Sequence, residues 1–385
     1  MKDCYIFTAK RTPIGSFLGQ LSSVSAPQLG AVAAKAAIGS LRPEEIQECI
    51  MGCVLTAGLG QAPARQVAIF SGLPNSVPAI TLNKVCGSGL KAVTLAADRL
   101  ALDRSQVILA GGMESMSQAP FLVKNARSGF KMGHQEMVDG MIHDGLWDVY
   151  NQFHMGVAAE LCVKEYRFSR EEQDQFAKES YERALRAIQS GEFKPEIAEV
   201  PVKSRKQELL VSEDEEPFRA DLEKMSSLKP VFDKSGSVTA ANASSLNDGA
   251  AALILSNKES LGGLKPMAKI LHQAEFAQKP EAFTTAPVFC VKKLLEEASL
   301  KVSDIKVFEI NEAFAAVAMA AQKDLEISRD QLNPRGGAVA LGHPIGASGA
   351  RLLTSLLYQL EPGEKGVVSL CIGGGEAIAV LVERL

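Results

Sequence analysis

Short apolar runs alternate with longer segments of helical periodicity along most of the chain. Apolar residues fill runs that predict buried strands at residues 4–9, 48–55, 107–112, 251–256, 307–311 and 367–372. Segments in which apolar residues recur every three to four positions predict helices at about 27–39, 88–102, 287–299, 312–324 and 347–360. This alternation of strands and helices is typical of an α/β protein.

The same order of elements occurs twice. In the first half, C-G-S-G-L-K-A-V (86–93) opens a helix and is followed by V-I-L-A-G-G-M-E-S (107–115). In the second half, G-A-V-A-L-G-H-P-I-G-A-S-G-A-R-L-L (337–353) opens a helix and is followed by V-V-S-L-C-I-G-G-G-E-A (367–377). Strand, small-residue turn, helix and glycine-rich strand end therefore recur in one order, which indicates a duplicated βα core.

A more polar segment, residues 118–245, separates the two copies. Its clearest element is a helix that begins after Ser169, because Ser169 and Glu172 form a capping box. The expected apolar face of that helix consists of Phe176, Tyr181, Leu185 and Ile188. We expect this segment to be an inserted subdomain that packs over the core.

Composition narrows the class of protein. A net charge of −4 does not favour binding to nucleic acid or to an anionic membrane. No apolar run approaches the roughly 18 residues of a membrane span, and a strand is predicted from about residue 3, so we expect a cytoplasmic protein. The seven cysteines are an odd number without zinc-site spacing, which favours reduced thiols and no metal site.

Cys86 lies where a helix begins, next to Gly87 and Gly89. The free N–H groups of a helix N-terminus lower the pKa of a thiol and stabilise an oxyanion, which favours a nucleophile; a core cysteine at a tight turn fits this stretch equally well. A nucleophile needs a base. His343 occupies the corresponding turn of the second repeat, so pseudo-symmetry places it near Cys86, and His154 is the second candidate.

Two further strand ends carry polar groups. Cys371 precedes the glycines at 373–375, whose N–H groups suit an anion, and its thiol can exchange a proton near neutral pH. Asn311 ends another predicted strand, where it polarises a carbonyl or caps the helix that follows. Sites in α/β proteins form at such strand ends.

In this combination the motifs resemble those of the thiolase family, and of its acetyl-CoA C-acetyltransferase group in particular. The resemblance covers essentially the whole chain. It rests on N-K-V-C-G-S-G-L-K-A-V (83–93), G-G-M-E-S-M-S (111–117), N-E-A-F-A (311–315), G-H-P-I-G-A-S-G (342–349) and C-I-G-G-G (371–375).

The resemblance implies a thiolase fold: two βαβαβαββ halves, each with a five-stranded mixed sheet, in a five-layer αβαβα arrangement. The first half is expected to comprise residues 1–117 and 246–262, and the second residues 263–385. The segment 118–245 is then the inserted loop domain, and its residues 131–148 resemble the loop through which short-chain thiolases form tetramers.

The resemblance also implies an activity, the reversible condensation of two acetyl-CoA to acetoacetyl-CoA and CoA by a ping-pong mechanism. Cys86 is then the acetylated nucleophile, His343 its base, and Cys371 the group that moves the α-proton. Asn311, through a water, and His343 form one oxyanion hole, while the N–H groups of Cys86 and Gly373 form the other. Coenzyme A is substrate and product, and no metal or redox cofactor is implied.

A further set of positions matches the family's coenzyme A contacts. These are His154, Met155, Arg219, Phe232, Ala243, Ser244, Leu246 and Phe314. Two residues nearby depart from the family pattern: Ser245 stands where many members have a glycine, and Phe283 where many have a methionine. The preferred length and branching of the acyl chain therefore stay open. The alternatives are a degradative 3-ketoacyl-CoA thiolase of longer or branched chains and a non-catalytic acyl-CoA-binding protein.

Overall fold

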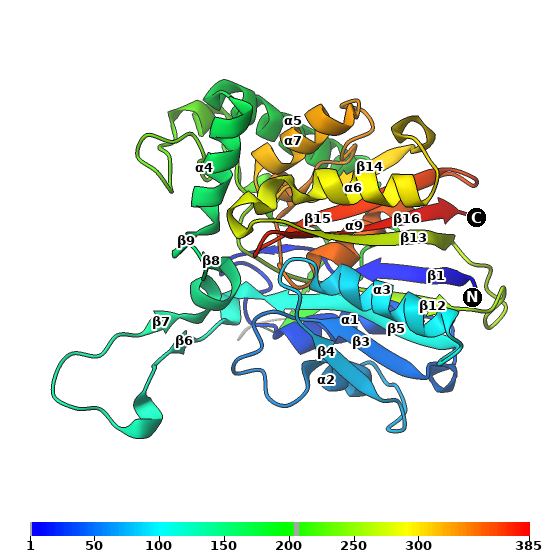
Figure 1. Cartoon of the computed structure of the whole chain (residues 1–385). Helices are drawn as coiled ribbons and strands as arrows, with labels where there is room; N and C mark the ends of the chain where they lie inside the picture. The colour runs from blue at the N-terminus through cyan, green and yellow to red at the C-terminus, as the bar shows by residue number, and fades with distance from the viewer. Residues whose placement is uncertain (1, 204–207) are drawn as a thin grey trace.

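The computed structural model describes residues 2–203 and 208–385. A mixed β-sheet of ten strands runs through its centre (Figure 1). The first half contributes β1 (Cys4–Arg11), β2 (Gly15–Ser16), β3 (Glu48–Gly52), β4 (Ala79–Leu82), β5 (Val107–Ser115) and β12 (Asn247–Ser256). The second half contributes β13 (Ala268–Ala277), β14 (Val307–Ile310), β15 (Lys365–Ile372) and β16 (Glu376–Arg384).

The strand order is β14-β15-β16-β13-β1-β12-β5-β3-β4, and β2 pairs with β12 outside this path. The two halves meet where Cys4, Tyr5 and Ile6 of β1 pair antiparallel with β13. The expectation of two five-stranded sheets is therefore modified, because the sheet is continuous. In the described residues the second half has four strands, and an isolated parallel bridge between Phe308 and Leu332 stands beside β14 where a fifth would lie.

Helices cover and separate the two halves. The first half carries α1 (Ala26–Ile38), α2 (Pro63–Phe70) and α3 (Ser88–Ala101), and the second carries α6 (Ala286–Glu297), α7 (Ala315–Leu325), α8 (Ala338–Leu341) and α9 (Ser348–Leu357). α3 and α9 pack against each other between the halves. The two helices cross with their backbones in contact, since a Cβ at Gly89 would lie 3.0 Å from the amide nitrogen of Ala350 and one at Gly349 only 2.6 Å from that of Leu90.

This arrangement contains the predicted repeat. β1-α1-β3-α2-β4-α3-β5-β12 in the first half corresponds to β13-α6-β14-α7-bridge-α9-β15-β16 in the second. The turn before α3 and the turn before α9 are equivalent positions, and the crossing of these helices brings them together. All six predicted strands and all five predicted helices of the core form, with ends shifted by a few residues.

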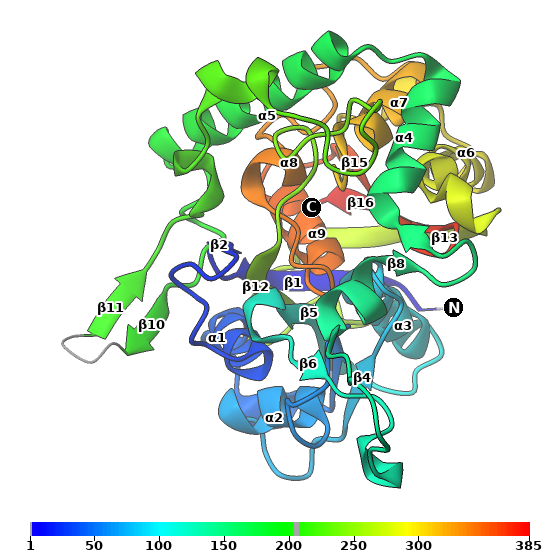
Figure 2. The ribbon, with the colours of Figure 1, turned by 90° about the vertical axis from the view of Figure 1, so that its left-hand side faces the viewer.

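The segment 118–245 lies over one end of the sheet (Figure 2). It contains α4 (Met155–Tyr166), α5 (Arg170–Gln189), the short pairs β6 (Phe121–Leu122) with β7 (Val138–Asp139) and β8 (Trp147–Asp148) with β9 (Phe153–His154), and the hairpin β10 (Val200–Lys203) with β11 (Glu208–Val211). The connection between β6 and β7 extends away from the body of the molecule (Figure 1).

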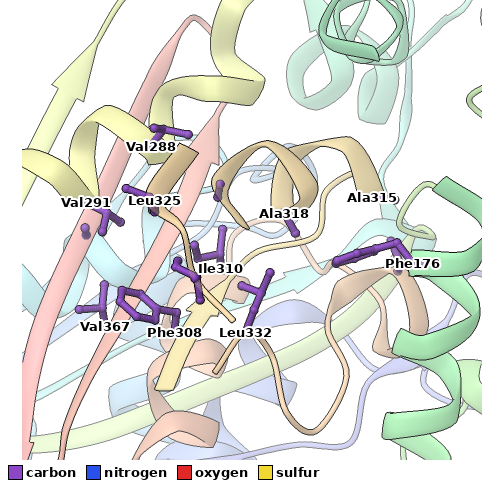
Figure 3. Packing of buried hydrophobic residues seen from close by; sticks show 14 of the residues in the cluster. Phe176, Val288, Val291, Phe308, Ile310, Ala315, Ala318, Leu325, Leu332 and Val367 are labelled. Atoms are coloured by element: carbon purple, nitrogen blue, oxygen red, sulfur yellow. The ribbon is translucent and has the colours of Figure 1, made fainter. Parts of the chain in front are cut away.

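The predicted capping box at Ser169 is present, and α5 begins there. Its buried face differs from the expectation, because Leu185 and Ile188 are only half-buried while small residues lie inside with Phe176 and Tyr181. Phe176 joins a cluster with side chains of α6, α7 and β14, among them Val291, Leu325 and Phe308 (Figure 3). The inserted segment thus shares its core with the second half of the molecule.

Candidate active site

A cavity of about 460 Å³ opens between the inserted segment and the ends of the core strands. Most of the residues expected from the sequence to bind or react line it: Cys86, His154, Met155, Phe232, Ala243, Ser244, Leu246, Phe314, His343 and Gly373. Cys371 and Asn311 lie behind its wall, both fully buried. Arg219 lies outside the cavity, exposed, with its guanidinium 3.6 Å from the carboxylate of Glu215.

Cys86 lies in a tight turn between β4 and α3. The preceding Val85 has a φ of +46°, a backbone conformation that a β-branched residue rarely adopts. Two hydrogen bonds hold Val85 in this conformation: the Asn83 side-chain oxygen accepts from the Val85 N–H at 2.8 Å, and the Ser88 hydroxyl donates to the Val85 carbonyl at 2.7 Å. The local sequence therefore maintains a strained turn that presents the thiol at the cavity.

The expectation of a lowered thiol pKa is wrong. Burial raises the pKa of Cys86 to about 11, although hydrogen bonds from the N–H groups of Gly373 and of Cys86 itself oppose this shift. Desolvation of a thiolate outweighs these two donors, one from the turn before α3 and the other from the residue after β15. Cys86 consequently carries its proton in the free protein at neutral pH, and an attack by its sulfur requires a base.

His343 is held from three sides. Its Nδ1 lies 2.6 Å from the Ser348 hydroxyl at the start of α9, and its Nε2 lies 3.4 Å from the side-chain nitrogen of Asn311. Its backbone N–H donates to the Asn247 side chain at 2.8 Å. Burial and then the positive charge of Arg351 lower the pKa of His343 to about 3, so its ring is neutral at physiological pH and can accept a proton.

Asn311 follows β14 directly and is tied to the neighbouring strand, because its N–H donates to the Ser369 carbonyl at 3.0 Å. This places its amide beside the imidazole rather than in the role of a helix cap, since α7 begins later, at Ala315. The sequence allowed Asn311 either to polarise a carbonyl or to cap the following helix, and its position excludes the helix cap.

Cys371 lies near the end of β15, two residues before Gly373. It packs in the apolar cluster that contains Met155 and Phe314. Burial, and then a charge on Cys86, raise its pKa well above the ordinary thiol value. The two thiols are thus electrostatically coupled, and each opposes ionisation of the other.

Aromatic side chains form the mouth of the cavity. The rings of His154 and Phe232 stack with centroids 4.8 Å apart, and those of Phe232 and Phe314 meet edge to face with centroids 6.1 Å apart. Phe283 also lines the cavity and meets Phe314 at 6.5 Å, edge to face. These rings give the cavity an apolar wall, of the kind common in small-molecule sites.

Three residues that contact His343 or its turn escaped the sequence reasoning: Ser348, Asn247 and Glu114. Ser348 stands inside the quoted G-A-S-G motif, where a hydroxyl at a helix start is a capping signal. The buried carboxylate of Glu114 accepts from the N–H groups of Val54, Leu55 and Gly346 at 2.9 to 3.1 Å, which ties the His343 turn to the first half. Nothing in the sequence pattern distinguishes Glu114 and Asn247 from ordinary polar residues, because their partners are distant in the chain.

A thiol at a strained strand-to-helix turn and a neutral imidazole line one cavity, and a second thiol is buried near them. This combination is typical of an acyl-transferring cysteine enzyme of the α/β class. Two family models cover nearly the entire chain, "Thiolase, N-terminal domain" over residues 4–259 and "Thiolase, C-terminal domain" over residues 264–384. The chain belongs to the thiolase family.

Known members are similar to this chain over their full length. A probable acetyl-CoA acyltransferase of Staphylococcus aureus is 50% identical and an acetyl-CoA acetyltransferase of Cupriavidus necator 48% identical, each match covering 100% of both chains. The crystal structure of the Acat5 thiolase of Ascaris suum in complex with coenzyme A has 45% identity and a TM-score of 0.96, with 100% of both chains covered. The acetyl-CoA acetyltransferase of Bacillus anthracis also has a TM-score of 0.96, at 39% identity, covering 100% of this chain and 99% of its own.

None of the helices in residues 2–203 and 208–385 combines the length and the apolar composition that crossing a bilayer requires.

Proposed function

We propose that this chain is an acetyl-CoA C-acetyltransferase, which condenses two molecules of acetyl-CoA to acetoacetyl-CoA and CoA and catalyses the reverse thiolysis. The observation that carries the proposal is the convergence of Cys86, His343 and the Gly373 N–H on one cavity, with Asn311 in contact with His343. The named relatives, at about half identity over their whole length, support the same activity.

In the first step the neutral His343 takes the proton of Cys86 as its sulfur attacks the thioester carbonyl. The negative charge then moves onto the carbonyl oxygen, and the N–H groups of Gly373 and Cys86 are the donors proposed to stabilise it. When the intermediate collapses, the C–S bond to CoA breaks and His343 returns the proton to the departing sulfur. The products are the acetylated Cys86 and CoA.

In the second step Cys371 removes the α-proton of a second acetyl-CoA. A charge on Cys86 opposes a thiolate on Cys371, whereas acetylated Cys86 carries none. Cys86 is neutral both as the resting thiol and as the acetyl thioester, so neither form opposes this proton transfer by its charge. The enolate carbon then attacks the acetyl carbonyl, the C–S bond to Cys86 breaks, and the proton held by Cys371 passes to the Cys86 sulfur. His343 and Asn311, the latter through a water, are the proposed donors to the enolate oxygen.

Coenzyme A is proposed to enter between α4 and the residues before β12. Ala243 forms a backbone bridge with Phe314, and the Ser244 hydroxyl donates to the Ala313 carbonyl at 2.9 Å, so this wall is rigid. Met155 and Leu246 supply apolar contacts for the pantetheine arm. Arg219, exposed outside the cavity, is proposed to meet the phosphates of the nucleotide.

The proposal includes the division of the chain into two halves with an inserted loop domain at 118–245. It also includes assembly into a homotetramer in the cytoplasm. The arm between β6 and β7 exposes Phe130, Met132 and Met137, and apolar side chains on an extended arm need a partner surface. Light scattering after chromatography tests this: deletion of residues 131–137 should convert a tetramer to dimers.

The test of the activity is intact and peptide mass spectrometry after acetyl-CoA is added, followed by CoA. An acetyl group on Cys86 that CoA removes is expected. Demonstrated CoA binding without any label would favour a non-catalytic acyl-CoA-binding protein. A chain-length series of 3-ketoacyl-CoA substrates separates the proposed enzyme from a degradative thiolase of longer or branched chains, and Phe283 at the cavity wall favours the short-chain activity.

A further inference from the structure

The loop that supplies the Gly373 N–H consists of three glycines in a row. Ile372 and Glu376 pair across the hairpin of β15 and β16, so Gly373, Gly374 and Gly375 form the whole connection between the strands. Gly374 and Gly375 have φ values of +94° and +89°, which glycine adopts without strain. Because this loop has no side chains that could pack, the direction of the Gly373 N–H depends on contacts at the two ends of the loop.

The far end of the loop is held by the segment that follows β13. The Gln278 N–H donates to the Gly375 carbonyl at 2.9 Å. A Cβ at Gly375 would lie only 2.4 Å from the Gln278 carbonyl oxygen, so the two backbones are in contact. Both segments belong to the second half of the chain, and this contact therefore does not fix the loop relative to Cys86 in the first half.

The turn that carries Cys86, residues 83–87, meets the glycine loop from the first half. The Gly373 N–H donates to the Cys86 sulfur. A Cβ at Gly373 would lie 3.8 Å from Cγ1 of Val85, so the two segments are in van der Waals contact. Their relative position decides whether the N–H groups of Gly373 and Cys86 point at one oxygen atom.

An ion pair joins the loop and the Cys86 turn directly. The ammonium group of Lys84, two residues before Cys86, donates to the carboxylate of Glu376, the first residue after the glycines. The backbone of Lys84 is part of the turn, because its N–H donates to the Ser88 hydroxyl at 2.8 Å and its carbonyl accepts from the Gly87 N–H at 3.0 Å. A displacement of Glu376 is therefore transmitted to the turn.

This ion pair belongs to a chain of four alternating charges. Glu275 of β13 accepts from Lys84 at 3.2 Å and from Lys91 of α3 at 2.5 Å. The four side chains, with Glu376 the last of them, are between 20% and 40% exposed. A single pair at such exposure stabilises little, whereas several charges in a network restrict the position of each member more strongly.

We propose that Lys84 and Glu376 are positioning residues, whose ion pair holds the Gly373 N–H and the Cys86 turn in the arrangement that binds the oxyanion of acyl transfer. The inference rests on the proposed function, in which the N–H groups of Gly373 and Cys86 are the oxyanion donors. It adds that charged side chains outside the cavity set the alignment of these donors, since neither Lys84 nor Glu376 lines the cavity.

The chemistry shows which step such a pair should affect. Negative charge develops on the thioester oxygen only as the Cys86 sulfur attacks, and donors stabilise it most strongly when they are fixed in advance. The contacts proposed for the pantetheine arm, at Met155 and Leu246, lie elsewhere in the cavity. A loosened loop should therefore slow the acetylation of Cys86 and leave the binding of acetyl-CoA unchanged.

The first experiment measures the rate of Cys86 acetylation over a range of acetyl-CoA concentrations, by rapid quench and intact mass spectrometry. Lys84→Met and Glu376→Gln should each slow the saturated rate about fivefold, well below the loss of a whole oxyanion donor, with an unchanged half-saturating concentration. The double variant should be no slower than either single variant, because both remove the same contact. Lys84→Arg, which keeps the charge, should retain the wild-type rate.

The second experiment measures hydrogen exchange of the peptide that contains Gly373, Gly374 and Gly375, in the absence of substrate. Exchange should be about fivefold faster in Lys84→Met and in Glu376→Gln, because their loop opens more often. Lys365→Met is the matched control. Lys365 pairs with Glu383 at 3.5 Å across the same two strands, at the end remote from the loop and with similar exposure, and its loss should change neither rate.

Slower acetylation together with faster exchange in both single variants supports the proposal. Faster acetylation in Glu376→Gln overturns it, because Lys84 would then act on the oxyanion through its own charge. An unchanged acetylation rate or unchanged exchange in a variant with wild-type thermal unfolding also overturns it, as does a double variant whose loss is the product of the two single losses.

Two further outcomes keep the test decisive. If Lys84→Met does not fold, Glu376→Gln decides by the same two measurements. If acetyl-CoA does not acetylate wild-type Cys86, the proposed activity has failed. Hydrogen exchange needs no substrate and then decides separately whether the ion pair holds the loop: faster exchange in the variants supports that contact, and equal exchange overturns it.

Discussion

Glu114 offers the sharpest test of how the His343 turn is held. Its carboxylate is fully buried and accepts hydrogen bonds from the N–H groups of Val54, Leu55 and Gly346. Burial nevertheless dominates and raises its pKa from 4.5 to about 7. Between these two pH values the folded protein holds a proton on Glu114 that the unfolded chain has released, so the free energy of unfolding must fall as the pH rises.

The magnitude follows from the two pKa values. Between pH 5 and pH 8 this one group should lower the free energy of unfolding by about 2.5 kcal/mol. Glu114→Gln cannot ionise, so its stability relative to the wild type should improve by that amount over the same pH range. Urea unfolding at pH 5, 6, 7 and 8 measures the difference, with the exposed Glu44→Gln as a control that shows no such trend. A stability difference that is constant across these pH values, or that grows with pH in favour of glutamate, would refute the reasoning.

Other substitutions test the remaining parts of the site. Cys371→Ser should still acquire an acetyl group on Cys86 but lose condensation by about a thousandfold, measured as acetoacetyl-CoA formation; normal condensation would invalidate the assignment of the two thiols. Ser348→Ala removes the 2.6 Å contact with His343 and should lower kcat by roughly tenfold with little change in KM, so an unchanged kcat would exclude an orienting role. Phe283→Ala should raise kcat/KM for six-carbon relative to four-carbon 3-ketoacyl-CoA by about tenfold; an unaltered ratio would place the limit on chain length elsewhere.

The sequence predicted the elements that have a strong local signal. The strands β5 and β12 are buried on both faces and read as continuous apolar runs, and α3 and α9 begin at small-residue turns. Two central strands escaped notice for different reasons. β13 is half-buried with polar residues such as His272 and Gln273 inside the run, so its periodicity is weak, and β16 directly follows the glycines that were assigned only to a binding loop.

The two strand-to-helix turns in the sequence predicted which residues meet at the candidate site, but they did not predict the pKa values of those residues. The repeat placed Cys86 and His343 at equivalent turns, and the crossing of α3 and α9 brings both to one cavity. The sign of the pKa shift of Cys86 was wrong because the sequence shows the helix start and not the depth at which the thiol is buried. Asn247 and Glu114 act through contacts between distant parts of the chain, which no local pattern reveals.

These observations explain why the resting site contains no charged pair. Burial raises the pKa of Cys86 to about 11 and, together with Arg351, lowers that of His343 to about 3, so the neutral thiol and neutral imidazole are strongly favoured. The N–H donors of Gly373 and Cys86 are insufficient to stabilise a thiolate in the free protein. On the proposed mechanism they become effective when charge passes to the carbonyl oxygen of a bound thioester, because donors fixed in a dry site stabilise most strongly the charge for which they are positioned. Interactions of this kind contribute in the transition state and not in the free enzyme, which is the condition for lowering a barrier. A thiol that ionises only as it attacks a bound thioester also reacts slowly with other electrophiles, because the reactive form is the thiolate and it is scarce in the free enzyme.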